Sequence, residues 1–289
     1  MKVKIVKTVK EVKDFVNQAE KEGKSVGFVP TMGYLHNGHR SLIHRARKEN
    51  DVVVVSIFVN PKQFGPNEDL ASYPRDLNRD AALCDEEGVD LIFNPEPEEM
   101  YGEDFYSYVG VNVLSEKLCG KTRPIHFQGV CTVVLKLFNI VKPDRAYFGQ
   151  KDAQQLAIIK RMVLDLNLDI DVKGCPIVRE EDGLAMSSRN TYLNKKERKA
   201  ALILSQSLQL AKRKAAGGDR NLAEILREMR TLIEMEPLAK IDYLEAVDIT
   251  TVQPVTELTE NTMIAMAVYI GKTRLIDNCM VLEEAAACR

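Results

Sequence analysis

Apolar positions recur at two different spacings in the first part of the chain. Between Thr8 and Gly23 they follow the spacing of a helix, and Thr8-x-x-Glu11 in front of them is the pattern of a capping box. The segment Asp51–Asn60 is instead almost continuously apolar, which is typical of a central parallel strand buried on both faces. The same reasoning predicts strands at 25–30, 89–94, 145–148 and 169–178, and helices that end at Arg47 or cover 77–87, 127–141 and 153–166. Strands that alternate with helices favour βαβ units in a parallel sheet.

The pattern changes after Val178. Two amphipathic helices are predicted at 195–216 and 222–234, and three closely spaced strands at 241–247, 263–270 and 274–280. Gly271-Lys272 predicts a tight hairpin between the last two strands. We therefore predict an α/β protein with a parallel-sheet domain at 1–175 and a smaller α+β domain at 176–289.

Composition narrows the functional class. The 289 residues carry 40 Lys and Arg against 42 Asp and Glu, a formal charge of −2, which excludes a strongly basic nucleic-acid footprint over the whole chain. The longest apolar run, Val52–Val59, is too short to span a membrane, and no signal-peptide core precedes it. The six cysteines contain no C-x-x-C pair, which favours reduced thiols. We expect a cytoplasmic protein that binds neither membrane nor nucleic acid.

The segment PTMGYLHNGH at 30–39 is the first candidate for chemistry, because it follows a strand and opens a helix. A helix N-terminus offers unpaired N–H groups and a partial positive charge, which suit phosphate. His36 and His39 are three residues apart and therefore share one face of the first turn. Two imidazoles there can donate to phosphate oxygens that gain charge during nucleotidyl transfer. A zinc pair is less favoured, since no cysteine or further histidine lies nearby in the sequence.

Two further segments share this character. FGQKDAQQ at 148–155 is again a strand end that runs into a helix, where Lys151 offers a point charge for phosphate and Asp152 can accept from ribose hydroxyls. DGLAMSSRN at 182–190 places small hydroxyl groups beside Arg189 in a loop that can grip a triphosphate. Each segment alone is also compatible with an ordinary polar turn or linker.

Three weaker signals remain. NPKQF at 60–64 closes the apolar strand, and KTRPIHF at 121–127 puts Arg123 and His126 before a helix. A structural role is as good an interpretation as a functional one for both. Asp76 and Asp80 are spaced for one helix face and can hold Mg²⁺ through water, although a solvated helix face explains them better.

Taken in this order, the motifs resemble the pantothenate synthetase (pantoate–β-alanine ligase) family over nearly the whole chain. The resemblance rests on PTMGYLHNGHRSLI, VVVSIFVNPKQF, YPRDLNRD, the segment from RPIHF to FGQKDAQQL, and LAMSSRN. H-x-G-H alone marks only a broad nucleotidyltransferase superfamily; its conjunction with FGQKD and MSSRN is far more specific. The resemblance implies a Rossmann-like first domain, a second domain that covers ATP, Mg²⁺ dependence and a homodimer. It also implies an ATP-dependent ligase that forms pantothenate, AMP and pyrophosphate through a pantoyl adenylate.

The resemblance also assigns roles to individual positions. Those implied for catalysis are His36, His39, Lys151, Ser187, Ser188 and Arg189, with His39 as proton donor. Those implied for ATP are Met32, Gly33, Tyr34, Leu35, His36, Asn37, Gly38, His39, Gly149, Gln150, Lys151, Asp152, Val178, Met186, Ser187, Ser188 and Arg189. Those implied for pantoate and β-alanine are Asn60, Gln63, Tyr73, Arg123, His126 and Gln155, and Asp80 is the implied metal-side acid.

Other functions fit parts of the pattern. A cytidylyltransferase or a phosphopantetheine adenylyltransferase shares H-x-G-H but leaves the nucleotide joined to its product. A class I tRNA synthetase is disfavoured by length and by the lack of a basic appendage. A non-catalytic nucleotide sensor would bind ATP without turnover; both histidines, Lys151 and the serine–arginine loop argue against it.

Overall fold

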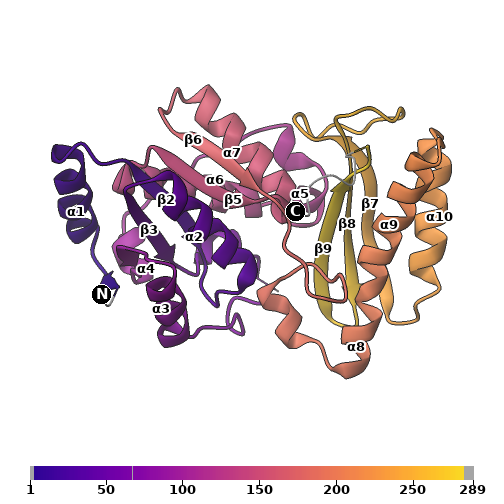
Figure 1. The fold of residues 1–289 in the computed structure, drawn as a ribbon, viewed down its shortest axis with the longest axis horizontal. Coiled ribbons are helices and arrows are strands. Elements are labelled where there is room, and N and C mark those ends of the chain that lie inside the picture. Colours follow the sequence, from indigo (N-terminus) through magenta and orange to yellow (C-terminus); the bar gives the residue numbers. More distant parts are fainter. Residues whose placement is uncertain (1–2, 67, 283–289) are drawn as a thin grey trace.

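The computed structural model describes residues 3–66 and 68–282 and contains two sheets with separate helical layers (Figure 1). The first sheet has six strands, all parallel, in the order β1-β4-β3-β2-β5-β6. Its strands are β1 Lys4–Val6, β2 Val26–Thr31, β3 Val52–Ile57, β4 Leu91–Phe93, β5 Arg145–Gly149 and β6 Asp171–Cys175. Its helices are α1 Val9–Lys21, α2 Asn37–Glu49, α3 Leu77–Glu86, α4 Pro97–Met100, α5 Cys119–Thr122, α6 His126–Val141 and α7 Ala153–Asp165. This confirms the predicted α/β, Rossmann-like architecture.

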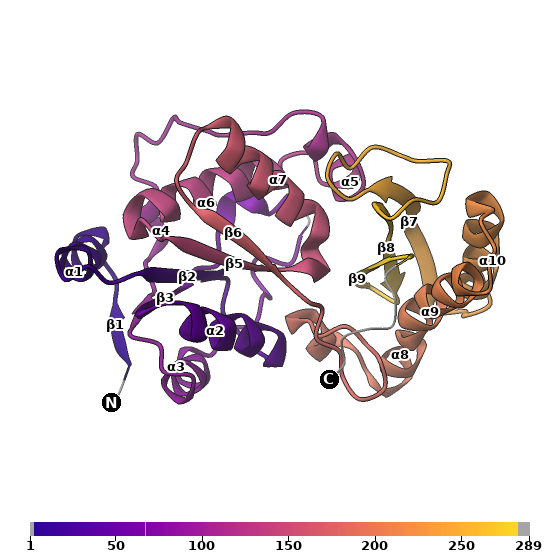
Figure 2. The ribbon, with the colours of Figure 1, turned by 45° about the horizontal axis from the view of Figure 1, so that its top comes forward.

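Helices cover both faces of this sheet, which explains why its strands are apolar throughout (Figure 2). In β3, Val54 packs into one core with Phe28 and Phe138, while Val53 and Val55 pack into the other with Ile43. The first core lies against α6 and α7, and the second against α2 and α3. Every residue of β3 is buried, as its DVVVV run predicts.

The second sheet is antiparallel, with the order β7-β8-β9. Its strands are β7 Ala239–Asp248, β8 Thr262–Ile270 and β9 Thr273–Met280, and its helices are α8 Lys195–Ala200, α9 Leu202–Ala216 and α10 Leu222–Glu234. The predicted hairpin is present: Ile270 pairs with Thr273, and Gly271 between them has φ +58°. Figure 2 shows the helices on one side of this sheet and the first domain on the other.

A short strand was missed, and one predicted helix is divided in the structure. The strand β1 was not predicted, because three residues are too few to show the period of a strand. The single helix predicted at 195–216 is divided at Ala201 into α8 and α9. The structure passes from β6, which ends at Cys175, to the elements of the second sheet, and the boundary at 175/176 stays a prediction. Within the residues described, no helix is long and apolar enough to cross a membrane.

The strand order places the candidate motifs side by side. β2 is hydrogen-bonded to β3 on one side and to β5 on the other, so the chain's connections diverge in opposite directions between β2 and β5. Ligands in open α/β sheets bind at such a switch point, beyond the carboxyl ends of the strands. The histidine segment follows β2 and the Lys151 segment follows β5, so both flank this point.

Candidate active site

A cavity of about 990 Å³ is lined by residues of both domains, among them Met32, Lys151 and Asn278. A second cavity of about 220 Å³ adjoins it and reaches the switch point of the first sheet. The two share a set of lining residues: Met32, Gln63, Lys151, Asp152, Gln155, Ser187 and Arg189. Residues of the histidine segment, the Lys151 segment and the serine–arginine loop therefore line the same pair of adjoining cavities.

His36 and His39 are held by the backbone of their own turn. His36 is the N-cap of α2, and its Nδ1 accepts from the backbone N–H of Gly38 at 3.1 Å. The Nδ1 of His39 accepts from the backbone N–H of His36 at 3.3 Å, and the ring centroids are 4.1 Å apart. Because both Nδ1 atoms accept, the proton of each neutral ring sits on Nε2. Both rings line the smaller cavity and can donate from Nε2.

Both histidines are neutral at neutral pH in the ligand-free protein. Burial, and then the charge of Lys151, lower the pKa of His36 to about 4. Burial, then His36 and Lys151, hold the pKa of His39 well below its ordinary value. The pair therefore supplies hydrogen-bond donors rather than positive charge.

A buried carboxylate shapes the turn in front of these histidines. Asp80 of α3 is 1% exposed, and its two oxygens accept from the backbone N–H groups of Tyr34 at 2.8 Å and Leu35 at 2.7 Å. Tyr34 takes φ +51°, and Gly33 takes φ +84°. A Cβ on Gly33 would lie 2.9 Å from Ile57 and 3.0 Å from Asp80, so glycine is required there. Asp80 therefore holds the backbone of the turn at 33–35 in its left-handed conformation.

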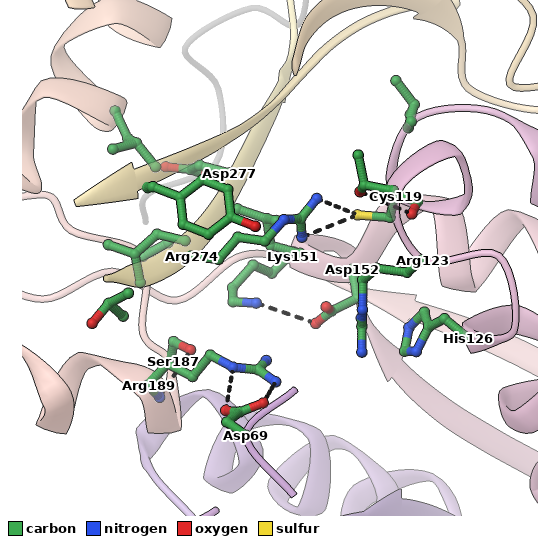
Figure 3. Close-up of a pocket in the computed structure, with 18 of the residues that line it drawn as sticks. Asp69, Cys119, Arg123, His126, Lys151, Asp152, Ser187, Arg189, Arg274 and Asp277 are labelled. Carbon is green, nitrogen blue, oxygen red and sulfur yellow. Dashed lines mark hydrogen bonds and ion pairs between the residues drawn. The ribbon is translucent and has the colours of Figure 1, made fainter. Parts of the chain in front are cut away.

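Lys151 stands in a 3₁₀ turn, Gln150–Asp152, between β5 and α7. Its side chain is mostly buried, and its Nζ is 3.3 Å from the carboxylate of Asp152 (Figure 3). Gly149 just before it lines the smaller cavity, and a Cβ there would meet no protein atom within 4 Å. The turn thus brings one cation to the switch point and leaves open space beside it.

The serine–arginine loop closes the cavity from the second domain. Ser188 donates from its hydroxyl to the carbonyl of Tyr34 at 3.3 Å, which ties the loop to the histidine turn. Arg189 forms a two-pronged pair with Asp69, with Nε at 2.9 Å and an NH₂ group at 2.8 Å from the two carboxylate oxygens (Figure 3). Burial alone would raise the pKa of Asp69, but the hydrogen bonds and the charge of Arg189, with further hydrogen bonds from the backbone and Tyr192, together leave it below its ordinary value.

The remaining predicted residues line the cavities around Gln63. His126 places Nδ1 3.0 Å from the carbonyl of Gln63, and burial, then Arg123, lower the pKa of His126 to about 4. Arg123 pairs with Glu68 through Nε at 2.8 Å and an NH₂ group at 2.5 Å. The amide of Asn60 donates to Gln63 at 3.0 Å. The pocket wall also includes Tyr73 and Gln155.

The comparisons with known proteins bear on the whole chain. A sequence model described as pantoate-beta-alanine ligase matches residues 4–280. A pantothenate synthetase of Clostridium botulinum (strain Loch Maree / Type A3) is 60% identical over 274 residues, 95% of this chain and 98% of that protein. One of Ruminiclostridium cellulolyticum is 61% identical over 276 residues, 96% of this chain and 98% of that protein. The chain belongs to the pantoate–β-alanine ligase family.

Solved structures of the pantoate–β-alanine ligase family have the same fold. The pantothenate synthetase of Thermus thermophilus superposes with a TM-score of 0.93 at 47% identity, covering 97% of this chain and 100% of that one. The pantoate-beta-alanine ligase of Francisella tularensis, complexed with beta-gamma ATP and beta-alanine, gives a TM-score of 0.81 at 37% identity. That match covers 98% of this chain and 99% of the Francisella chain. The family resemblance seen in the sequence is therefore confirmed.

Not every residue predicted for the family's ATP site faces the cavities. Leu35 is 1% exposed and packs in the core with Ile43 and Val55, so its side chain belongs to the fold. The cavity linings also leave out other predicted residues: Gly33, Tyr34, Asn37 and Gln150. Tyr34 takes part through its backbone, which contacts Asp80 and Ser188.

The metal expectation finds no support in the geometry. Both oxygens of Asp80 already accept backbone N–H groups in a closed site, which is not the donor set of an open metal ligand. Over 3–66 and 68–282, no three His, Cys, Asp or Glu side chains gather as they would to hold a metal ion. Asp80 has a positioning role at this turn, and its expected metal role stays a prediction.

Some residues at the site escaped the sequence analysis. Glu68 and Asp69 hold the two arginines, and Asp277 and Asn278 of β9 border the cavity. Their positions carry one usable signal: polar residues interrupt the apolar pattern of the last predicted strand at 277–278. Glu68 and Asp69 lie in a polar loop where no pattern distinguishes them.

Proposed function

We propose that this chain joins pantoate to β-alanine with consumption of ATP, through a pantoyl adenylate. The carboxylate of pantoate attacks the α-phosphorus of ATP, and pyrophosphate leaves. The amine of β-alanine then attacks the acyl carbon, and AMP leaves as pantothenate forms. The observation that carries this is the meeting of two Nε2 donors, Lys151 and Arg189 at one cavity on the switch point of the sheet. Family membership supports the choice of substrates.

On the ATP side, the first and third motifs act from opposite domains. His36 and His39 present neutral N–H donors to oxygens that gain charge at the α-phosphorus, which needs no reorganisation because the turn already fixes both rings. Lys151 and Arg189 supply the positive charge. The proposed ATP-contacting set is Met32, His36, Gly38, His39, Gly149, Lys151, Asp152, Val178, Met186, Ser187, Ser188 and Arg189.

On the carboxylate side, the wall around Gln63 is proposed to hold pantoate and β-alanine. It is built from Asn60, Gln63, Tyr73, Arg123, His126 and Gln155. The carboxylate of pantoate is already an anion, so its attack needs no general base. Positioning and charge therefore supply most of the catalysis.

Mg²⁺ is proposed to enter with ATP as part of that substrate. Its chemistry is to offset the phosphate charges, and the phosphate oxygens are hard ligands suited to it. Three carboxylates at the cavity are engaged with cations: Asp69 with Arg189, Glu68 with Arg123, and Asp152 with Lys151. We assign no protein ligand to the metal.

The decisive test is isotope exchange. With enzyme, Mg²⁺ and pantoate present and β-alanine absent, labelled pyrophosphate should enter ATP, and omission of pantoate should abolish the exchange. If pyrophosphate stays bound to the enzyme, no exchange is seen even when the adenylate forms. Rapid-quench detection of the adenylate tests for that outcome. AMP that forms only with all three substrates, with neither exchange nor adenylate, would establish a concerted reaction instead.

We also propose a homodimer in the cytoplasm. The dimer rests on the family resemblance, and the location on the buried thiols of Cys84, Cys119, Cys131 and Cys175. Light scattering at about 65 kDa would support the dimer, whereas the chain mass of 32.5 kDa would refute it. Fractionation of the source cells tests the location.

A further inference from the structure

Asn278 of β9 contacts the segment that carries Lys151, although it lies outside every motif described above. Its side-chain amide donates to the backbone carbonyls of Gln150 at 3.0 Å and Lys151 at 2.9 Å. These carbonyls belong to the 3₁₀ turn in front of α7. The residue is 8% exposed, and both N–H donors of its amide are matched to an acceptor. One side chain of the second domain therefore fixes the backbone of Lys151.

The preceding residue, Asp277, contacts the segment that leads into the serine–arginine loop. Consecutive residues of a strand point to opposite faces, so the two neighbours reach different elements. Asp277 is 2% exposed, and its two oxygens accept from Arg179 at 2.7 and 3.0 Å (Figure 3 labels Asp277 beside the cavity). Arg179 also donates to the carbonyl of Gly183 at 3.1 Å.

Arg179 stands at the base of a small hairpin that ends at the serine–arginine loop. It pairs with Ala185 in an antiparallel bridge, and Met186 donates its N–H to the carbonyl of Val178 at 3.0 Å. Ser187 follows directly. The ion pair of Asp277 therefore anchors the hairpin from which that loop projects.

We propose that Asp277 and Asn278 are positioning residues that hold Lys151 and the Ser187–Arg189 loop at the separation that the triphosphate of ATP requires. The proposal rests on the ATP-dependent function above. Leu275 and Cys279, which lie two residues to either side of Asp277 on β9, already bury the strand in the apolar core of the second domain. Strand packing alone would not call for a buried carboxylate and amide next to each other, because polar groups are unfavourable to bury unless paired. Each of the two residues contacts a segment that carries a group proposed to bind phosphate. Asn278 contacts the backbone of Lys151, and Asp277 contacts Arg179 in the hairpin before the serine–arginine loop.

The first experiment compares substrates in the full-length enzyme. Asn278→Ala should lower kcat/KM for ATP about five- to tenfold, as loss of two neutral hydrogen bonds felt at Lys151 implies. The KM values for pantoate and β-alanine should stay within about twofold. Asn278→Asp keeps the shape but sets a carboxylate against two carbonyls, so its loss should be at least as large. Asp277→Asn, which removes the charged partner of Arg179, should weaken ATP use in the same selective way.

Asn221→Ala is the matched control. Asn221 lies in the same domain and caps α10 by accepting from the N–H of Glu224 at 3.1 Å. Its loss should lower the thermal midpoint without a selective change in ATP kinetics, because the cap contacts no ATP segment. If Asn278→Ala fails to fold, Asn278→Ser retains one donor and takes its place.

A second measurement separates positioning from stability. ATP affinity is measured by calorimetry in the wild type, Asn278→Ala, Lys151→Ala and the double variant. If Asn278 acts through Lys151, its substitution should change affinity little once Lys151 is alanine. An equal loss for all three substrates, an undiminished loss in the Lys151→Ala background, or no loss at all would overturn the proposal. Failure of the proposed function shows separately, as absence of AMP release by the wild type with all three substrates.

Discussion

The histidine turn and the serine–arginine loop face the same cavity but are held in opposite ways. The histidine turn is fixed by backbone hydrogen bonds within one domain, and its rings are partly buried and neutral. The loop is held across the domains by the ion pair between Arg189 and Asp69. Under the proposed function, the turn meets the transition state without rearrangement, whereas Arg189 exchanges a carboxylate for a phosphate.

The same exchange applies to the neighbouring pair. Glu68 and Asp69 are adjacent in one loop and hold Arg123 and Arg189, respectively. Two acidic side chains thus occupy the groups proposed to bind anionic substrates. The histidine turn is preorganised, whereas on the other side of the cavity acidic side chains compete with substrates for the arginines. Substitutions should distinguish these two effects.

The largest effect is expected at the groups that are proposed to face phosphate directly. His39→Ala and Lys151→Ala should each lower kcat/KM about 10–150-fold, because a hydrogen bond to a charged group contributes about 1.5–3 kcal/mol. Steady-state AMP release measures the loss, and circular dichroism checks the fold. Near-normal turnover in either variant would remove that residue from the mechanism.

Gly38→Ala tests how much the preorganised turn contributes. A Cβ at Gly38 would lie 2.8 Å from Cε1 and 2.9 Å from Nδ1 of His36, so the ring must rotate and lose its backbone donor. We expect kcat to fall about fivefold, the effect of one neutral hydrogen bond. Gly102→Ala, where a Cβ meets nothing within 4 Å, is the control. Unchanged kcat in Gly38→Ala would mean that ring orientation is unimportant.

Asp69→Asn tests the competing side. Without the carboxylate, Arg189 no longer has to exchange partners, so ATP should bind about threefold to fivefold more tightly, the effect of one partly exposed ion pair. Glu68→Gln is the matched comparison, because Glu68 pairs with Arg123 and should leave ATP affinity unchanged. Calorimetry measures both. Weaker ATP binding in Asp69→Asn would mean that Asp69 orients Arg189 for the phosphate rather than competing with it.

The smallest effect concerns stability and pH. Burial lowers the pKa of His36 and His126 from 6.5 to about 4, so the unfolded chain binds more protons than the native one between these values. The contribution of these two histidines to the free energy of unfolding is therefore fully present above pH 6.5, and it is lost as the pH is lowered toward 4. We expect the thermal midpoint to drop by at least about 3 °C from pH 6.5 to pH 4.5.

His126→Asn should flatten this pH dependence. Asparagine can still donate to the carbonyl of Gln63 but cannot take up a proton. Thermal unfolding at several pH values tests this. An identical slope in wild type and variant would show that His126 does not contribute. Glu68 and Asp69, whose pKa values lie below their ordinary range, lose their contribution only at lower pH.

Much of the fold follows from local patterns in the sequence. The unbroken apolar run of β3 could be predicted because both faces of a central parallel strand are buried. The capping box at Thr8 and the hairpin at Gly271 are also local, and both occur as predicted. The helix predicted at 195–216 was divided because Ala201 lies in a turn between two helices, which periodicity does not register.

The sequence by itself determined which residue types can handle phosphate: the histidines, Lys151 and the serine–arginine loop, each next to glycine or a helix start. Only the tertiary structure decided what their neighbours do. Asp80 supports the backbone of Tyr34 and Leu35, because the strand order brings α3 against the histidine turn. Asp69 and Asn278 reach their partners across about 120 and 127 residues of chain, respectively. Such contacts form because the two domains pack against each other. Neither the local spacing of apolar residues nor a short motif can predict contacts between residues so far apart in the sequence.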